Sequence, residues 1–299
     1  MKTILLVSIL CLVYGVSWQI SHGLHACRLS CLGKRTIDLA ILPRLLIAIT
    51  ALLGAGATYA QALGVVMMHG KWGTLPPWHT TVSRSIEHEG WPVIELAMPW
   101  AGNRLYDAPY ESALKQIADA VKELRAKGVK RVIVGGHSFG ANAAIAYAGS
   151  GGDSDGILAM ASGHLPRSSY NNGTTKDTVD QARQLMAAGR GNEILNFIDT
   201  NQGKRRTLRA RADIFLSYFD PEGLGDIPTS MAHIGKPLPL MWLVGTGDQL
   251  FARGQVFAYD RAPLHPLSRY VVVEADHLNT PSVGREQVIE WLKTITMQP

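Results

Sequence analysis

The sequence predicts an α/β fold, with a mainly parallel sheet flanked by helices on both faces. The first observation is that, from Leu63 to the end of the chain, short apolar runs alternate with segments of helical periodicity. The second is the change of pattern at 132–144, where "VIVGGHSFGANAA" passes from a β-branched run through glycines to an alanine-rich helical pattern. The third is one long stretch, 166–237, in which the strand signal vanishes.

Apolar runs mark the expected strands, and periodic segments mark the expected helices. A helix over 110–127 is indicated by apolar residues on one face, among them Leu114, Ile117 and Val121, with Gly128 as a stop signal. We expect strands at 64–68, 92–97, 129–134, 156–160, 238–244 and 270–273. We expect the remaining helices at 79–88, 139–148, 255–259 and 281–296.

The stretch 166–237 carries helical patterns in place of strands. The segments "VDQARQLMAAG", "NEILNFIDT" and "ARADIFLSYF" predict two or three helices, inserted before a later strand. Such an insertion predicts a small helical cap over the site. Its basic run "GKRRTLRAR" is interpreted as a solvated helix face, the alternatives being attraction of an anionic acyl group or of a membrane surface.

The sequence divides into an N-terminal targeting region, 1–62, and a globular domain, 63–299. Basic residues precede the apolar segment "LLIAITALLGAGA", and the small residues of "ATYAQA" offer cleavage after Ala60 or Ala62. This layout predicts a signal peptide and an exported protein, periplasmic or secreted. The apolar stretch at 4–16 fits a second signal, a membrane anchor or sequence upstream of the natural start. Packing of the whole region into the domain is the other alternative.

Charge and cysteine content narrow the function classes. The net charge is +5, but the basic excess lies mainly before Leu63, and the rest of the chain is nearly balanced. The balance therefore gives no argument for nucleic acid as a partner, and we expect membrane contact only through the N-terminal segment. The three cysteines all lie in that segment, so we expect no disulfide and no thiol chemistry in the domain.

Ser138 is the candidate nucleophile. It stands at a strand-to-helix corner, with Gly136 two residues before it and Gly140 two residues after it, which is a G-x-S-x-G pattern in the setting of a nucleophile elbow. A serine hydroxyl needs a base to take its proton. The side chain of the neighbouring His137 should diverge from Ser138 in so sharp a turn, so the base is expected from elsewhere in the chain.

The last two predicted strands each end beside a residue that suits a catalytic serine. Asp248 follows one strand in "GTGDQL", and His277 follows the other in "EADHLNT". Because ligands of open parallel sheets bind beyond the carboxyl ends of the strands, both side chains are expected near Ser138. Each alone also fits an ordinary turn or surface residue. The carboxylates that compete with Asp248 are Asp213, Asp220, Asp226 and Asp276.

With serine, aspartate and histidine in this chain order, the sequence resembles the α/β-hydrolase superfamily from Leu63 to about Lys293. The motifs "GGHSFG", "GTGD", "ADH" and "MMHGKWG" carry the resemblance. Two features depart from the family pattern. The family commonly has two further strands before the His-Gly strand, which predicts a sheet trimmed at its N-terminal side here. In addition, "HGKW" stands where one lipase and esterase branch has "HGGG".

The resemblance also implies an oxyanion hole beside Ser138. Its donors would be the backbone N–H of Phe139 and one N–H from Lys71 or Trp72. His69 would then be a structural turn residue rather than a second base.

These features predict a serine hydrolase that cleaves carboxylic esters of small molecules through an acyl-enzyme intermediate. A thioesterase or peptidase would use the same triad, and a non-catalytic binding protein on a hydrolase scaffold is the rival class. No cofactor is needed, and no metal is expected because the H-E-x-x-H and C-x-x-C patterns are absent. Trp78 and Trp100 are candidates for an aromatic substrate pocket, with ordinary core packing as the alternative.

Overall fold

The computed structural model describes residues 62–73 and 80–297, which lie within one compact unit, Tyr59–Pro299. The predicted signal segment and Trp78 lie outside the described residues. Expectations about them therefore stay predictions.

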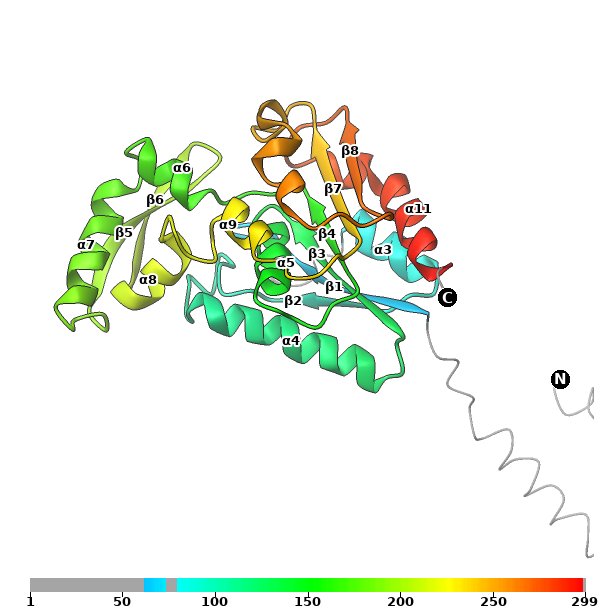
Figure 1. The fold of residues 1–299 in the computed structure, drawn as a ribbon. Helices are drawn as coiled ribbons and strands as arrows, with labels where there is room; N and C mark the ends of the chain where they lie inside the picture. Colours follow the sequence, from blue (N-terminus) through cyan, green and yellow to red (C-terminus); the bar gives the residue numbers. More distant parts are fainter. Residues whose placement is uncertain (1–61, 74–79, 298–299) are drawn as a thin grey trace, which may run out of the picture. The chain divides into compact units, whose positions relative to one another are not determined.

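The main sheet of the described residues has six strands in the order β2-β1-β3-β4-β7-β8 (Figure 1). The strands are β1 (Leu63–Met68), β2 (Val93–Leu96), β3 (Arg131–His137), β4 (Gly156–Met160), β7 (Leu240–Gly245) and β8 (Arg269–Val273). Every neighbouring pair is parallel. β1, β4 and β7 are buried along their whole length, because strands of a parallel sheet are covered on both faces.

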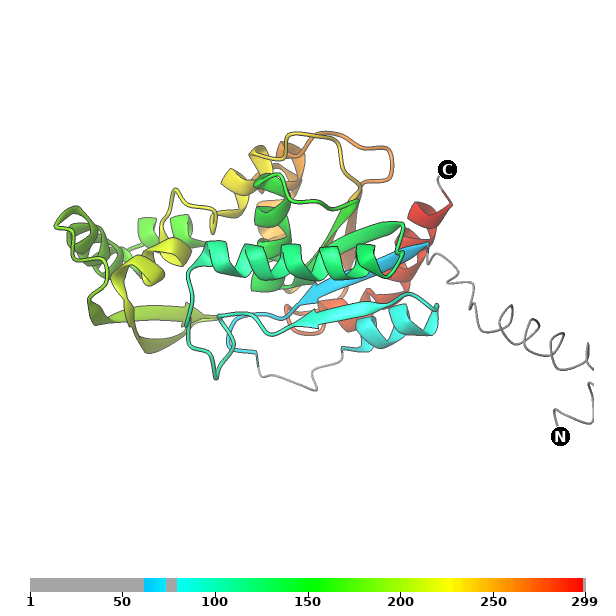
Figure 2. The same ribbon diagram turned by 90° about the horizontal axis from the view of Figure 1, so that it is seen from below.

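Helices cover both faces of this sheet (Figure 2). On one face, the apolar stripe of α4 (Tyr110–Ala126) and nearly all of α5 (Phe139–Gly149) join a core with Val66 and Val134. On the other face a second core contains apolar residues of α3 (Thr81–His88) and α11 (Arg285–Thr296). Within residues 62–73 and 80–297, no helix has both the length and the apolar character needed to cross a membrane.

The chain between β4 and β7 forms an inserted segment, 166–232, whose first five elements group beyond the main sheet in Figure 1. Its elements are α6 (Pro166–Asn171), α7 (Lys176–Ala187), β5 (Ile194–Asn201), β6 (Lys204–Arg211), α8 (Ala212–Phe219) and α9 (Ile227–Ala232). The helix expected at "NEILNFIDT" is wrong, because this stretch is mostly strand β5. The basic run forms the antiparallel strand β6 rather than a helix face. Positive φ angles at Gln202 (48°) and Gly203 (75°) form the tight two-residue turn that connects β5 to β6.

Two other expected helices differ in detail from the structure. The predicted helix at 255–259 is replaced by three short 3₁₀ turns, η1 (Phe251–Arg253), η2 (Gln255–Phe257) and η3 (Tyr259–Arg261). The predicted helix at 281–296 is divided at Gly284 into α10 (Thr280–Val283) and α11. A Cβ on Gly284 would lie 2.5 Å from a Leu243 methyl group, so close packing against β7 accounts for the glycine at this break.

Candidate active site

Ser138 occupies a sharp turn between β3 and α5, with φ 57° and ψ −115°. A positive φ is uncommon for a residue with a side chain, and such strain concentrates at functional sites. The flanking glycines are needed because the end of β1 passes close by. A Cβ on Gly136 would lie 2.6 Å from the Met68 carbonyl oxygen, and a Cβ on Gly140 would collide with the same atom. The G-x-S-x-G spacing therefore has a steric cause in this fold.

The loops after β7 and β8 bring Asp248 and His277 to Ser138. The Nε2 of His277 lies 2.9 Å from the Ser138 Oγ, and its Nδ1 lies 2.5 Å from the Asp248 Oδ2. With a neutral imidazole, the serine hydroxyl donates to Nε2 and the Nδ1–H donates to the carboxylate. Asp248 is 4% exposed, and its Oδ1 accepts the Leu250 N–H at 2.7 Å, which fixes the carboxylate. The three side chains form one continuous hydrogen-bonded chain.

The neighbouring groups that could compete for these roles are engaged elsewhere. The Nε2–H of His137 donates to the backbone carbonyl of His277 at 2.9 Å, and burial, reinforced by the nearby His277, lowers the pKa of His137 to about 4. The carboxylate of Asp276 accepts hydrogen bonds from the Asn279 backbone and side chain. The other candidate carboxylates pair with arginines: Asp213 with Arg211, Asp220 with Arg183 and Asp226 with Arg167.

Two backbone N–H groups beside Ser138 have no hydrogen-bond partner among the described residues. One belongs to Phe139, the first residue of α5, and the other to Lys71, in the loop after β1. The N–H of Trp72 is not available, because it donates to the Trp100 carbonyl at 3.0 Å. Unpaired N–H groups at the N-terminal end of a helix favour a bound negative charge. Of the expected donors, Phe139 and Lys71 are thus the two that can receive an oxyanion.

A buried ion pair fastens the loop after β1 to the inserted segment. Asp199 of β5 accepts hydrogen bonds from the Lys71 ammonium at 2.8 Å, the Trp72 indole N–H at 2.6 Å and the Tyr106 hydroxyl at 3.1 Å. The side chain of Asp199 is 0% exposed and that of Lys71 is 5% exposed. Burial alone raises the pKa of Asp199, but the Lys71 charge and the hydrogen bonds outweigh it and hold this pKa below its usual value. We call these four residues the Asp199 cluster.

Ser138 and His277 line a cavity of about 430 Å³. Most of its other lining side chains are polar, and the majority of these come from the inserted segment. Examples are Ser169, Asn172, Thr200, Asn201, Arg205 and Gln249. The cavity therefore presents hydroxyl, amide and guanidinium groups to a substrate.

The expectation that Trp100 lines this pocket is wrong. Trp100 is 0% exposed, its indole N–H donates to the His69 carbonyl at 2.9 Å, and its ring stacks on Phe139 at 4.4 Å between centroids. His69 is likewise structural, because its Nδ1–H donates to the Gly70 carbonyl and its Nε2 accepts the Met98 N–H. Through these contacts both residues hold the backbone of the loop after β1.

Among the residues that sequence reasoning missed, two lie close to the nucleophile and its neighbour Phe139, both in the loop after β4. Gly163 lies against the nucleophile, since a Cβ at this position would be 2.6 Å from the Ser138 Oγ. His164 stacks on Phe139 and donates its Nε2–H to the Tyr218 carbonyl at 2.7 Å, and burial lowers its pKa to about 3. The available signal was their position, directly after the predicted strand 156–160. No cluster of three or more His, Cys, Asp or Glu in the described ranges could hold a metal ion.

The sequence and the fold were compared with those of known proteins. A model of the alpha/beta hydrolase family matches residues 65–294. A monoacylglycerol lipase from Paleococcus ferrophilus is similar in structure, with a TM-score of 0.55 and 19% identity over 77% of this chain and 94% of the other. A structure from work on the metagenome-derived lipolytic enzymes LipS and LipT has a TM-score of 0.53 and 12% identity, over 80% and 95% of the two chains. At these identities the likeness shows the fold alone. No curated protein sequence matches the chain.

Proposed function

The chain belongs to the alpha/beta hydrolase family, and on that premise we propose that it is a serine hydrolase of carboxylic esters. The observation that carries the proposal is the hydrogen-bonded chain of Ser138, His277 and Asp248 beside two unpaired backbone N–H groups. A nucleophile, a base, an orienting carboxylate and oxyanion donors are the parts that acyl transfer requires.

In the first half of the reaction, the Ser138 Oγ attacks the ester carbonyl carbon while His277 Nε2 takes the hydroxyl proton. The negative charge that develops on the carbonyl oxygen is received by the N–H groups of Phe139 and Lys71. Asp248 accepts the Nδ1–H and stabilises the imidazolium that forms. His277 then gives the proton to the leaving alkoxide, so the ester C–O bond breaks, the alcohol departs and an acyl-enzyme remains.

In the second half, a water molecule takes the place of the alcohol. His277 removes one proton from it, and the hydroxide attacks the acyl carbon in the same oxyanion site. Collapse of the tetrahedral intermediate returns the proton to the Ser138 Oγ and releases the carboxylic acid.

The lining of the cavity supports short or polar acyl groups rather than long aliphatic chains. Asn172, Asn201 and Gln249 offer amide groups, and Arg205 offers a guanidinium with no hydrogen-bond or ion-pair partner among the described residues. A long apolar chain would strip water from these groups without replacing its hydrogen bonds, which is unfavourable. Thioesters and amides remain the second candidates, because the same triad serves them.

A panel of p-nitrophenyl esters of increasing acyl length, with matched thioesters and anilides, tests the proposal. We expect a burst of nitrophenolate equal to the enzyme concentration wherever deacylation is slow, and faster turnover of short and polar acyl groups. Ser138→Ala should lose turnover while Asp276→Asn retains it. Faster cleavage of the thioesters would favour the alternative bond class. Turnover that survives in Ser138→Ala would refute the nucleophile, and no turnover of any substrate would favour a binding protein.

Export of the protein is a second proposal, and it rests on the signal-like layout of residues 34–62. Protein recovered from the periplasm of an expressing bacterium should begin near Gln61 or Leu63 by N-terminal sequencing. A cytoplasmic product that still starts at Met1 would contradict it.

A further inference from the structure

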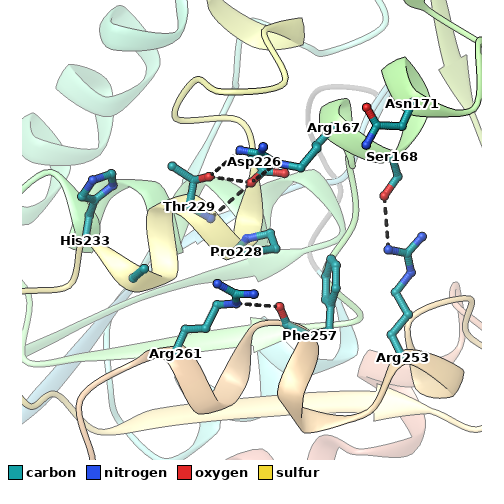
Figure 3. Close-up of a pocket in the computed structure, with 11 residues that line it drawn as sticks. Arg167, Ser168, Asn171, Asp226, Pro228, Thr229, His233, Arg253, Phe257 and Arg261 are labelled. Atoms are coloured by element: carbon teal, nitrogen blue, oxygen red, sulfur yellow. Dashed lines mark hydrogen bonds and ion pairs between the residues drawn. The ribbon is translucent and has the colours of Figure 1, made fainter.

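A second and larger cavity, of about 700 Å³, lies between the inserted segment and the 3₁₀ turns that follow β7 (Figure 3). We call it the seam cavity. One wall comes from α6 and α9, and the other from the stretch that contains Arg253, Phe257 and Arg261. It is distinct from the catalytic cavity, because the two cavities share no lining residue among those that the structure describes.

The single carboxylate that lines the seam cavity is already neutralised. Asp226 lies 3.2 Å from the Nε of Arg167 and accepts hydrogen bonds from the backbone N–H and the hydroxyl of Thr229, at 3.2 Å and 2.6 Å. It is 3% exposed. The charge of Asp226 is therefore balanced by that of Arg167, through contacts that all involve Oδ2.

The arginines of the opposite wall lack such a partner. Arg253 donates only to the Ser168 hydroxyl, at 3.2 Å, and Arg261 donates only to the carbonyl of Phe257, at 3.1 Å. Neither forms an ion pair in the part of the chain that the structure describes. A guanidinium carries five N–H donors, so most donors of both groups remain unused. Both arginines are exposed, so these donors are open to solvent and to a ligand, and two cations without a carboxylate partner in the described ranges can bind an anion beside this one hollow.

The rest of the lining suits an apolar body attached to that anion. The Phe257 ring lies under the Arg253 guanidinium, 4.9 Å from its centre, and Figure 3 shows the ring reaching into the space opposite Pro228. Ala232 completes this apolar surface. An inorganic ion would use the arginines alone, whereas an aromatic or short aliphatic oxyanion would use both parts.

We propose that the seam cavity binds a small organic oxyanion, a carboxylate or a phosphate monoester on a compact apolar body, through Arg253, Arg261 and Phe257. Planar, bidentate recognition of either oxyanion is the particular strength of guanidinium groups. Because the two walls come from the inserted segment and from the turns just after Asp248, the bound anion would bridge them and raise the melting temperature.

Isothermal titration of the full chain at constant ionic strength tests the proposal, with benzoate, phenyl phosphate, benzamide and inorganic phosphate as probes. We expect saturable one-to-one binding of benzoate or phenyl phosphate, together with an increase in melting temperature. Benzamide, which has the same shape as benzoate but no charge, should not bind. Whether benzoate or phenyl phosphate binds more tightly tells which oxyanion the site prefers. No saturable binding of either, or equal affinity for benzamide, would overturn the proposal, as would inorganic phosphate that binds as tightly as phenyl phosphate.

Variants locate the bound anion. Arg253→Gln and Arg261→Gln should each weaken binding at least about tenfold, since each removes a charge-assisted contact. Arg285→Gln, which alters a half-exposed arginine on α11 that does not line the seam cavity, should not change binding. Binding lost in Arg205→Gln but kept in Arg253→Gln and Arg261→Gln would place the anion in the catalytic cavity and refute the seam site. Because binding is measured without turnover, and can be repeated in Ser138→Ala, the result is independent of the proposed esterase activity.

Discussion

Asp199→Asn is expected to destabilise the protein strongly, although Asp199 lies far along the chain from the catalytic residues. The substitution keeps the size of the side chain but removes the charge that faces the Lys71 ammonium, where both side chains are 5% exposed or less. Removal of one partner from a buried ion pair costs about 3–5 kcal/mol, because the other charge is left uncompensated. Burial already lowers the pKa of Lys71, and Asp199 opposes this effect. In the variant, the pKa of Lys71 should fall further.

The same substitution should reduce turnover, because Lys71 also supplies a candidate oxyanion N–H. The Asp199 cluster holds Lys71 and Trp72 by their side chains, so its loss loosens the loop that aims this N–H. The decrease in kcat should reach at most about 10²–10³-fold, the cost of one oxyanion donor, and kcat should change more than KM.

Matched variants separate the ion pair from a general structural effect. Lys71→Met removes the nearest opposite charge of Asp199 and leaves only the Arg206 guanidinium, 3.7 Å away, so it should also be strongly destabilising. The double variant Lys71→Met with Asp199→Asn removes both charges, and its free energy of unfolding should exceed the additive expectation by about 0.5–3 kcal/mol. Asp119→Asn breaks an exposed ion pair with Lys115 on α4 and serves as the control, with little expected change.

Urea unfolding and initial rates on a p-nitrophenyl ester are the assays. If Asp199→Asn unfolds within about 1 kcal/mol of the parent, the pair contributes far less than its burial indicates. If the losses in unfolding free energy of the two single variants sum to the loss of the double variant, the two charges do not stabilise each other as the structure indicates. If Asp199→Asn lowers kcat no more than the Asp119→Asn control does, Asp199 does not position the Lys71 N–H for catalysis.

Other substitutions and conditions test further parts of the site. Asp248→Asn should melt nearly normally yet lose about 10⁴-fold in kcat, while Asp276→Asn stays active, and the reverse result in parallel assays would move the acid to Asp276. Gly163→Ala should fold but lose about 10²-fold in kcat, because the new methyl group displaces the Ser138 hydroxyl; parent-like turnover would refute the close approach. Burial lowers the pKa of His137 to about 4 and that of His164 to about 3, from 6.5. The unfolded chain therefore binds protons that the folded chain excludes as the pH falls below 6.5, so the urea midpoint should decrease from pH 7 to pH 4 and a flat profile would contradict this.

The main sheet could be predicted from the sequence because its signals are local. Buried parallel strands are continuous apolar runs in the sequence. Each strand of the main sheet therefore begins and ends within a few residues of the bounds that the sequence predicts. Ser138, Asp248 and His277 could be placed together for the same reason, since each follows a strand of one parallel sheet and thus lies at one edge. Gly163 follows another of these strands, but its role depends on the distance from its backbone to a side chain, for which a lone glycine gives no sign.

The hairpin of β5 and β6 shows where local signals fail. Phe197 and Asp199 are two residues apart and both are buried, so they share the inward face of β5. A charged residue at an inward position breaks the apolar alternation by which a strand is identified, and the stretch then resembles an amphipathic helix. The structure tolerates the carboxylate chiefly because Lys71, 128 residues away in sequence, supplies the nearest opposite charge, at 2.8 Å. The misassigned strand and the unforeseen support of the oxyanion loop therefore have one cause, a pairing between distant residues that neither segment reveals by itself.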